Sequence, residues 1–174
     1  MPEQFLNKHN TRNFFNTPIF DYNCGGFALG TYAWYIPYYN QGEEYSVENR
    51  IADIQFCLDS GMDEEEILES LIETDSESIL KDFPNLVRIY EDDVYRLAVN
   101  HKIVAFREGV EILTNGGCRP LLTDQDFHFK IRIGGDWYEK NGEGKIMRCE
   151  LHPDMCWVGT DISYSGPIAY FTIQ

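Results

Sequence analysis

The stretch DFHFKIRIGGDWYEKNG, residues 126–142, decides the fold of this chain. Along its first half apolar side chains alternate with polar ones, which is the two-residue period of a β-strand with unlike faces. The glycine pair that follows is a strong signal for a two-residue turn, so we expect the chain to return as an antiparallel strand. A tight turn sets the register of the two strands. The predicted cross-strand pairs are then Ile133 with Asp136, Lys130 with Glu139, and His128 with Asn141.

His128 is the side chain in this hairpin that can act as a general base. The alternation puts it on the polar face, away from the core, together with Glu139 and Asn141. Either of those two can accept the imidazole N–H, fix its tautomer and stabilise the imidazolium. A histidine on a solvated strand face is the alternative, and we assign such a solvated role to His9 and His101.

A candidate nucleophile stands in NCGGFALGTY, residues 23–32. Asn23 is a good N-cap, and we expect a helix from there until Pro37 ends it. Glycines beside Cys24 let a substrate approach the backbone, and the N–H groups at a helix start stabilise a thiolate. The alternative is that Cys24 is a small buried hydrophobe, which is how we interpret Cys57 within its helical apolar pattern.

The remaining pattern predicts helices first and strands afterwards, which is an α+β order. Ser46 opens a helix that runs to Gly61, and Asp63 with Glu66 resembles a capping box that opens the next helix. A short helix then stops before Pro84, and β-branched and aromatic runs, ending in YFTIQ, predict an antiparallel sheet. We expect a single domain over residues 1–174, with an N-terminal arm over 1–20 and an acidic helical insert over 46–83.

Composition limits the partners. The 174 residues carry a formal net charge of −15, which argues against nucleic acid and anionic membranes, because both are bound through clustered Lys and Arg. Eight acidic residues fall within residues 63–78, a run typical of a solvated helix face. The N-terminus lacks a signal-peptide layout, and no apolar run reaches membrane-spanning length. Five cysteines make an odd number, so we expect a cytoplasmic protein.

The two boxes together resemble the NlpC/P60 cysteine peptidases, which are papain-like in fold. NCGGFALGTY resembles the DCSGFV box of that family, with Cys24 in the place of the nucleophile. DFHFKIRIGGDWYEKNG resembles its second box, in which His128 matches the base histidine that opens a strand. The chain is also similar to a phage and Firmicutes group with NCYAYAL and DYHFYRQNSDGTWSHKPG signatures.

The resemblance implies a papain-like α+β fold and a thiol hydrolase, a cysteine peptidase or amidase that works without a cofactor. Its substrates would be peptides or proteins, peptidoglycan stem peptides among them. The third polar residue, usually histidine, is here Glu139 or Asn141. Pro18 stands where papain-like enzymes carry a glutamine. The oxyanion hole therefore rests on the backbone N–H of Cys24, capped by Asn23, and on a second donor that the sequence does not assign.

Two other interpretations stay open. One is a catalytically silent, acidic binding or inhibitory protein on the same scaffold, of phage origin, that engages a basic protein partner. The other is structural zinc, because the segment CELHPDMC carries two cysteines and a histidine and a further cysteine precedes it. The spacing is loose and contains no CxxC, so we expect no metal at these ligands: Cys118, Cys149, His152 and Cys156.

Overall fold

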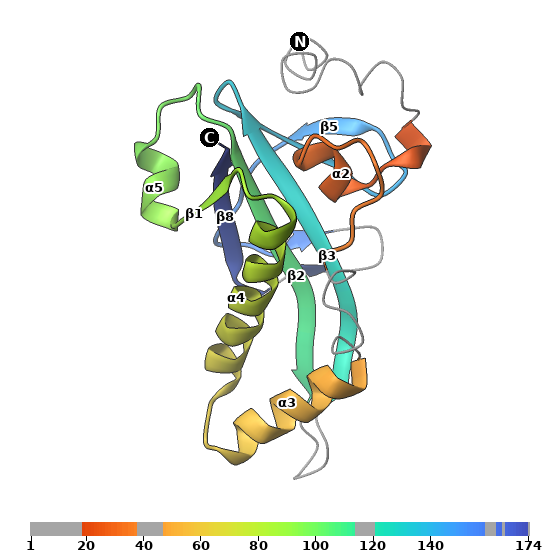
Figure 1. Cartoon of the computed structure of the whole chain (residues 1–174), viewed down its shortest axis with the longest axis vertical. Coiled ribbons are helices and arrows are strands. Elements are labelled where there is room, and N and C mark those ends of the chain that lie inside the picture. Colours follow the sequence, from red (N-terminus) through yellow and green to blue (C-terminus); the bar gives the residue numbers. More distant parts are fainter. Residues whose placement is uncertain (1–18, 38–46, 114–120, 159–162, 165, 174) are drawn as a thin grey trace.

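The computed structural model describes residues 19–37, 47–113, 121–158, 163–164 and 166–173 (Figure 1). An antiparallel sheet of six strands, in the order β1-β8-β2-β3-β4-β5, forms its centre, and β6 and β7 pair as a separate ribbon. The helices are η1 (Ile19–Asp21), α2 (Cys24–Ala28), α3 (Val47–Asp59), α4 (Glu64–Asp82) and α5 (Glu91–Arg96). The strands are β1 (Leu86–Ile89), β2 (Ile103–Leu113), β3 (Leu121–Ile133), β4 (Asp136–Lys140), β5 (Ile146–Cys149), β6 (Trp157–Val158), β7 (Ser163–Tyr164) and β8 (Ile168–Ile173). The predicted α+β class is confirmed.

The β3–β4 hairpin has the predicted register over most of its length. Gly134 and Gly135 take the left-handed φ values of 62° and 90° that a two-residue turn between antiparallel strands requires. Two predicted pairs form at the turn and further along, Ile133 with Asp136 and Lys130 with Glu139. The described ladder ends at the second pair, so the predicted pairing of His128 with Asn141 is absent from it. Asn141 lies exposed in the turn after β4.

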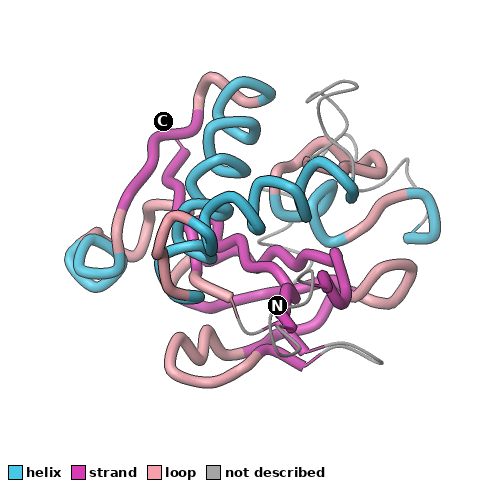
Figure 2. Tube along the Cα trace, turned by 90° about the horizontal axis from the view of Figure 1, so that it is seen from below, coloured by secondary structure: helices cyan, strands magenta, loops and turns pink. Residues whose placement is uncertain are grey.

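The sheet is covered on both faces. Helix α4 packs against β1, β2 and β8, and α2 packs against β3 and β4. Figure 2 shows most of the helices gathered on one side of the strands. The core on this side includes Tyr22, Phe27, Phe106, Phe129 and Phe171. On the other side a second apolar cluster forms around Ile103, Ala105, Leu151, Trp157, Tyr164 and Tyr170.

This second cluster overturns the prediction that the polar face of β3 lies away from the core. His128, Lys130 and Arg132 are only 4%, 4% and 7% exposed. Polar and apolar side chains alternate along β3 as expected, but the segment that contains Leu151, Trp157 and Tyr164 folds back over the polar side of the strand. Each cation must therefore find a partner without water. Lys130 donates to the Glu150 carbonyl at 2.6 Å, and the Arg132 guanidinium donates to the carbonyls of Val94, Ala98 and His101.

Two predicted helix boundaries are wrong. The helix that begins at Cys24 ends at Ala28 rather than near Pro37, because Gly30 and Tyr32 adopt left-handed φ values and turn the chain away. Helix α4 is continuous where two helices were predicted. Its polar second half stays helical because it is buried against the sheet, and the Ser76 hydroxyl donates to the carbonyl four residues earlier.

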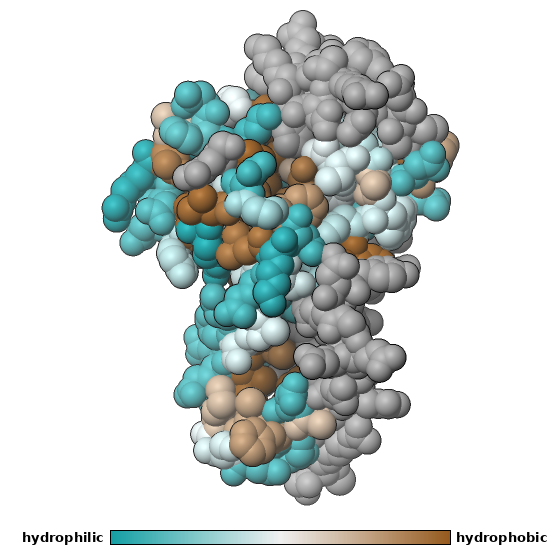
Figure 3. All heavy atoms as spheres, viewed as in Figure 1, coloured by the Kyte–Doolittle hydropathy of each residue, from teal (hydrophilic) through white to brown (hydrophobic). Residues whose placement is uncertain are grey.

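The other helical predictions agree with the structure. Helix α3 covers the predicted segment, although its expected N-cap, Ser46, lies outside the described residues. The Asp63 side chain accepts the Glu66 N–H at 2.8 Å, the first half of the predicted capping box. Helix α4 exposes the acidic residues of the run except Asp75, which is buried, and Figure 3 shows mainly hydrophilic residues over the helix. No helix in the described part of the chain is long and apolar enough to cross a membrane.

We expect Gly26→Ala to destabilise the protein by about 1–3 kcal/mol or more, as overpacking does. A Cβ on Gly26 would stand 1.8 Å from the Ala33 carbonyl oxygen, so the backbone after α2 would have to move. Gly25→Ala is the matched control, because its Cβ would meet only the rings of Tyr35 and Phe129 at 3.1 Å or more. Urea unfolding measures both variants, and equal losses of stability would contradict the assignment.

Candidate active site

Cys24 begins helix α2 and lies in the core between that helix and the sheet, with 5% of its surface exposed. The glycines after it serve packing: Gly26 lies against the Ala33 backbone, and Gly25 lies against the Phe129 ring. A side chain at position 26 would collide with the backbone after α2, whereas one at position 25 would crowd the Phe129 ring of β3. The sequence had suggested glycines for substrate approach, and the structure shows that they allow close packing of α2 against the chain that follows it and against β3.

Asn23 caps α2 as predicted and also fixes the chain that leaves the helix. Its Oδ1 accepts the N–H of Gly26 at 3.0 Å and the N–H of Tyr35 at 3.1 Å. Its Nδ2 donates to the Tyr35 carbonyl at 2.7 Å. The Asn23 side-chain amide is thus bonded to the Tyr35 backbone through both its oxygen and its nitrogen. These contacts describe a cap and a loop clamp, and participation in an oxyanion hole stays a prediction.

The structure brings Cys24, His128 and Glu139 together. The ladder between β3 and β4 stops short of His128, and α2, which packs on both strands, brings Cys24 to the imidazole. Burial by itself would lower the pKa of His128. Interactions of the ring with Cys24 and with Glu139 outweigh burial and raise the pKa of His128 to about 9.

Glu139 is the polar residue that faces the imidazole. Its Oε1 lies 3.5 Å from His128 Nε2 and its Oε2 lies 3.5 Å from Lys130 Nζ. Burial would raise the pKa of Glu139, but interactions with His128, with Cys149 and with the charge of Lys130 lower it to about 2. The other candidate, Asn141, is exposed beyond the end of β4. Burial raises the pKa of the Cys149 thiol, which stays protonated.

Two aromatic rings hold the imidazole from the side of the second cluster. The Tyr164 ring stacks on His128 with 5.3 Å between centroids, and Trp157 meets it edge to face at 6.1 Å. The Lys130 ammonium lies 4.5 Å from the centre of the Trp157 ring. The sequence analysis missed these rings, because residues 157 and 164 lie in short strands with no motif of their own. Only the tertiary structure brings them to β3.

A pocket of about 370 Å³ opens onto this group. His128, Lys130 and Glu139 form its polar wall, and Trp157 is among the side chains that complete it. Cys24 is not among the described residues that line the pocket. The thiol is thus not part of the described lining of this pocket, and Cys24 as a whole is 5% exposed.

The alternative metal ligands are only partly described. Cys149 contacts Glu139, whereas His152 and Cys156 lie exposed in the following segment, and Cys118 lies outside the described residues. Within the described ranges no group of three or more His, Cys, Asp or Glu side chains is arranged to hold a metal ion. The described cysteines Cys24, Cys57, Cys149 and Cys156 are all free thiols.

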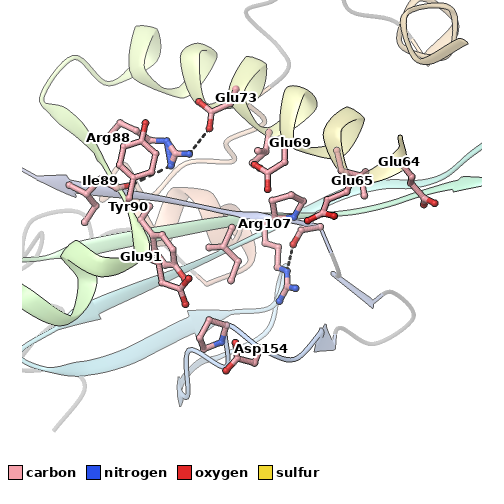
Figure 4. Close-up of a pocket in the computed structure, with 17 residues that line it drawn as sticks. Glu64, Glu65, Glu69, Glu73, Arg88, Ile89, Tyr90, Glu91, Arg107 and Asp154 are labelled. Atoms are coloured by element: carbon pink, nitrogen blue, oxygen red, sulfur yellow. Dashed lines mark hydrogen bonds and ion pairs between the residues drawn. The ribbon is translucent and has the colours of Figure 1, made fainter. Parts of the chain in front are cut away.

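A second and larger cavity, of about 720 Å³, lies between helix α4 and the sheet, away from Cys24 (Figure 4). Its carboxylates come mainly from one side of α4, and Arg88 and Arg107 supply the opposite charge. Arg88 is bound to Glu73 at 2.8 Å, and Arg107 donates to the Gly166 and Met155 carbonyls at 2.6 Å each. The acidic groove is lined by six carboxylates: Glu64, Glu65, Glu69, Glu73, Glu91 and Asp154.

Comparison with protein-family models, with curated proteins and with solved structures found no match to this chain.

The pKa shifts predict how stability depends on pH. His128 has a raised pKa, so its stabilising contribution is complete below about pH 6.5 and is lost as the pH rises through about 9. Glu139 has a lowered pKa, so its contribution is complete above about pH 4.5 and is lost as the pH falls through about 2. Glu139→Gln should remove much of both contributions to stability. It should also move the midpoint of the His128 titration, measured by NMR, to lower pH. A His128 midpoint unchanged by Glu139→Gln would contradict the contact.

Proposed function

We propose that this protein is a thiol hydrolase of papain-like type, a cysteine peptidase or amidase. The observation that carries the proposal is that the Cys24 thiol and the Glu139 carboxylate both interact with one buried imidazole, that of His128. A nucleophile, a base and an orienting carboxylate are the parts that acyl transfer through a thioester requires. In the sequence a cysteine at a helix start comes first and a histidine on a strand follows, and this order supports the likeness to NlpC/P60 peptidases.

The reaction follows from the charge states that the site favours. With a pKa of about 9, His128 is an imidazolium at neutral pH and faces the sulfur as its counter-ion. The Cys24 thiolate attacks the amide carbonyl carbon, and His128 gives its proton to the nitrogen, so that the amine leaves and a thioester forms. Water then attacks the thioester while His128 takes a proton from it, which releases the acid and restores the thiolate.

Glu139 serves this cycle as a positioning residue. A carboxylate beside the imidazole stabilises the imidazolium and holds the ring in one orientation, as the third member of such triads does. Lys130 and Cys149 bind the same carboxylate and keep it in place. The Tyr164 ring stacked on the imidazole limits its rotation. The substrate class that we propose is peptide or protein amides, including peptidoglycan stem peptides.

Thiol labelling tests whether Cys24 is a thiolate. At pH 6 an ordinary thiol with a pKa of about 8.5 is only about 0.3% ionised, so iodoacetamide reacts with it slowly. We expect Cys24 to react at least about tenfold faster than the exposed Cys156 at this pH, despite its burial. Peptide mass spectrometry measures each rate, and His128→Ala should abolish the difference. Equal rates at Cys24 and Cys156 in the unaltered protein would refute an activated thiol.

Hydrolysis itself is tested by mass spectrometry of peptide amides and of peptidoglycan stem peptides incubated with the protein. We expect Cys24→Ala to lower any cleavage rate by roughly 10⁶-fold, as removal of the nucleophile does in related mechanisms. The rate should also decline above about pH 9, where His128 loses the proton that the leaving amine needs. Cleavage that survives Cys24→Ala would mean that this site does not carry it.

The acidic groove favours a second candidate function, a binding protein for a basic partner. Six carboxylates around a 720 Å³ cavity, in a chain of net charge −15, complement a cationic peptide segment. Binding to a lysine-rich peptide should then weaken strongly between 50 and 300 mM salt, be weakened by Glu65→Gln with Glu69→Gln, and be unchanged by Cys24→Ala. Binding that ignores both salt and the glutamine changes would exclude this function.

A further inference from the structure

The β6–β7 ribbon carries the two aromatic rings that pack on the His128 imidazole. Trp157 of β6 and Tyr164 of β7 are cross-strand partners, so their rings stand on the same face of the ribbon. The Tyr164 ring stacks on the imidazole at 5.3 Å, and Trp157 meets it edge to face at 6.1 Å. The described ladder of the ribbon has two residue pairs, and so short a two-stranded ribbon is marginally stable by itself. Contacts with the rest of the fold must therefore hold it over the imidazole.

Arg107, on strand β2, bonds to the chain on both sides of this ribbon. Its Nε donates to the Gly166 carbonyl at 2.6 Å, and its Nη1 donates to the Met155 carbonyl at 2.6 Å. Met155 stands two residues before Trp157 in the chain. Gly166 stands two residues after Tyr164. One guanidinium therefore joins the segment that enters the ribbon to the segment that leaves it, and it also lies 5.5 Å from the centre of the Trp157 ring.

The β2–β3 register places Arg107 directly opposite His128. Cross-strand partners share a face of the sheet, so the guanidinium and the imidazole both project toward the ribbon. Arg107 is 7% exposed and His128 is 4% exposed. Hydrogen bonds from a buried cation are charge-assisted and shielded from water, which makes them stronger than exposed ones. A guanidinium suits this place, because it stays charged when buried and its rigid fork serves two acceptors at once.

We propose that Arg107 is a positioning residue, which clamps the β6–β7 ribbon so that its two rings hold the His128 imidazole in one orientation. The inference rests on the proposed hydrolase, in which the two nitrogens of the ring must face the nucleophile and the carboxylate at the same time. A ring that turns would lose both alignments. Misplacement of a catalytic group by about 1 Å can lower a rate by about 10²-fold.

NMR of the His128 ring tests the clamp independently of any reaction. The ring current of the stacked Tyr164 displaces the imidazole C–H signals, and these are compared at pH 6 in the unaltered protein, Arg107→Met and Arg107→Lys. We expect Arg107→Met to lose most of the displacement. Arg107→Lys should lose part of it, because lysine keeps the charge but lacks the fork that serves two carbonyls.

Arg88→Met and Arg88→Lys are the matched controls. Arg88 is the other arginine of the acidic groove (Figure 4), and it is bound to Glu73 of α4 at 2.8 Å. Both control variants should leave the His128 signals unchanged. Equal changes in the Arg88 and Arg107 variants would refute the clamp, because they would reflect a general loosening of the fold.

Thiol reactivity measures the consequence for the proposed site. The rate of Cys24 alkylation by iodoacetamide at pH 6 is measured in the same variants. Cys57 of α3 is the internal reference, because Cys156 directly follows the clamped Met155. We expect the Cys24 rate to fall roughly tenfold in Arg107→Met and roughly threefold in Arg107→Lys, within the range that misplacement of a catalytic group can cause. The Arg88 variants should keep the rate of the unaltered protein.

Arg107→Lys decides the question if Arg107→Met does not fold, because it retains the buried positive charge. Unchanged His128 signals in Arg107→Lys would refute the two-point clamp. Altered signals with an unchanged Cys24 rate would show that Arg107 only stabilises the ribbon, and would refute the positioning role.

The outcomes also separate this inference from the proposed function. If Cys24 reacts far faster than Cys57 in the unaltered protein and equally fast in both Arg107 variants, the positioning role is refuted and the hydrolase stands. If Cys24 reacts no faster than Cys57 in the unaltered protein, the hydrolase is refuted and the catalytic role of Arg107 with it. Losses of ring displacement and of Cys24 reactivity that follow Arg107 but not Arg88 support the proposal.

Discussion

The buried imidazole of His128 is the interaction on which the arrangement of this site depends. Removing an imidazolium from water is unfavourable, so the fold must supply negative charge and hydrogen-bond partners to keep it ionised. Glu139 supplies negative charge from the neighbouring strand, and Cys24 interacts with the ring from a helix start. Glu139 is held in turn by Lys130 and Cys149. Loss of one member would leave the others buried without compensation, which is why several elements converge here.

Strand β4 links the two faces of the sheet in this scheme. Because successive residues point to opposite faces, Glu139 reaches the histidine and Lys140 reaches the chain that leads into α2. The turn at Gly134 and Gly135 sets the register that makes both placements possible. A slip of one residue would exchange the carboxylate and the ammonium, and would place each beside the wrong partner. The hairpin therefore decides which face of the sheet receives the carboxylate and which receives the ammonium.

The pocket beside His128 and the acidic groove beneath α4 are connected through one segment of chain. His152 and Met155 line the pocket, whereas Pro153 and Asp154 line the groove. His152 has a left-handed φ of 46°, which turns the segment sharply between the two cavities. The Met155 carbonyl also accepts a hydrogen bond from Arg107, whose side chain lies at the groove. Any ligand that displaced this segment in the groove would also move a wall of the pocket.

The sequence by itself determined the α+β class, the β3–β4 turn with its register near Gly134, the cap of α2 and the grouping of Cys24, His128 and Glu139 as candidates. Each depends on local rules: strand alternation, turn chemistry and capping. Only the tertiary structure decided that Asn141 lies outside the site, that the polar face of β3 is buried, and that Lys140 donates to the Tyr22 carbonyl. Those outcomes depend on residues far apart in the chain, such as Trp157 against Lys130, and no local pattern encodes which distant segment covers a strand.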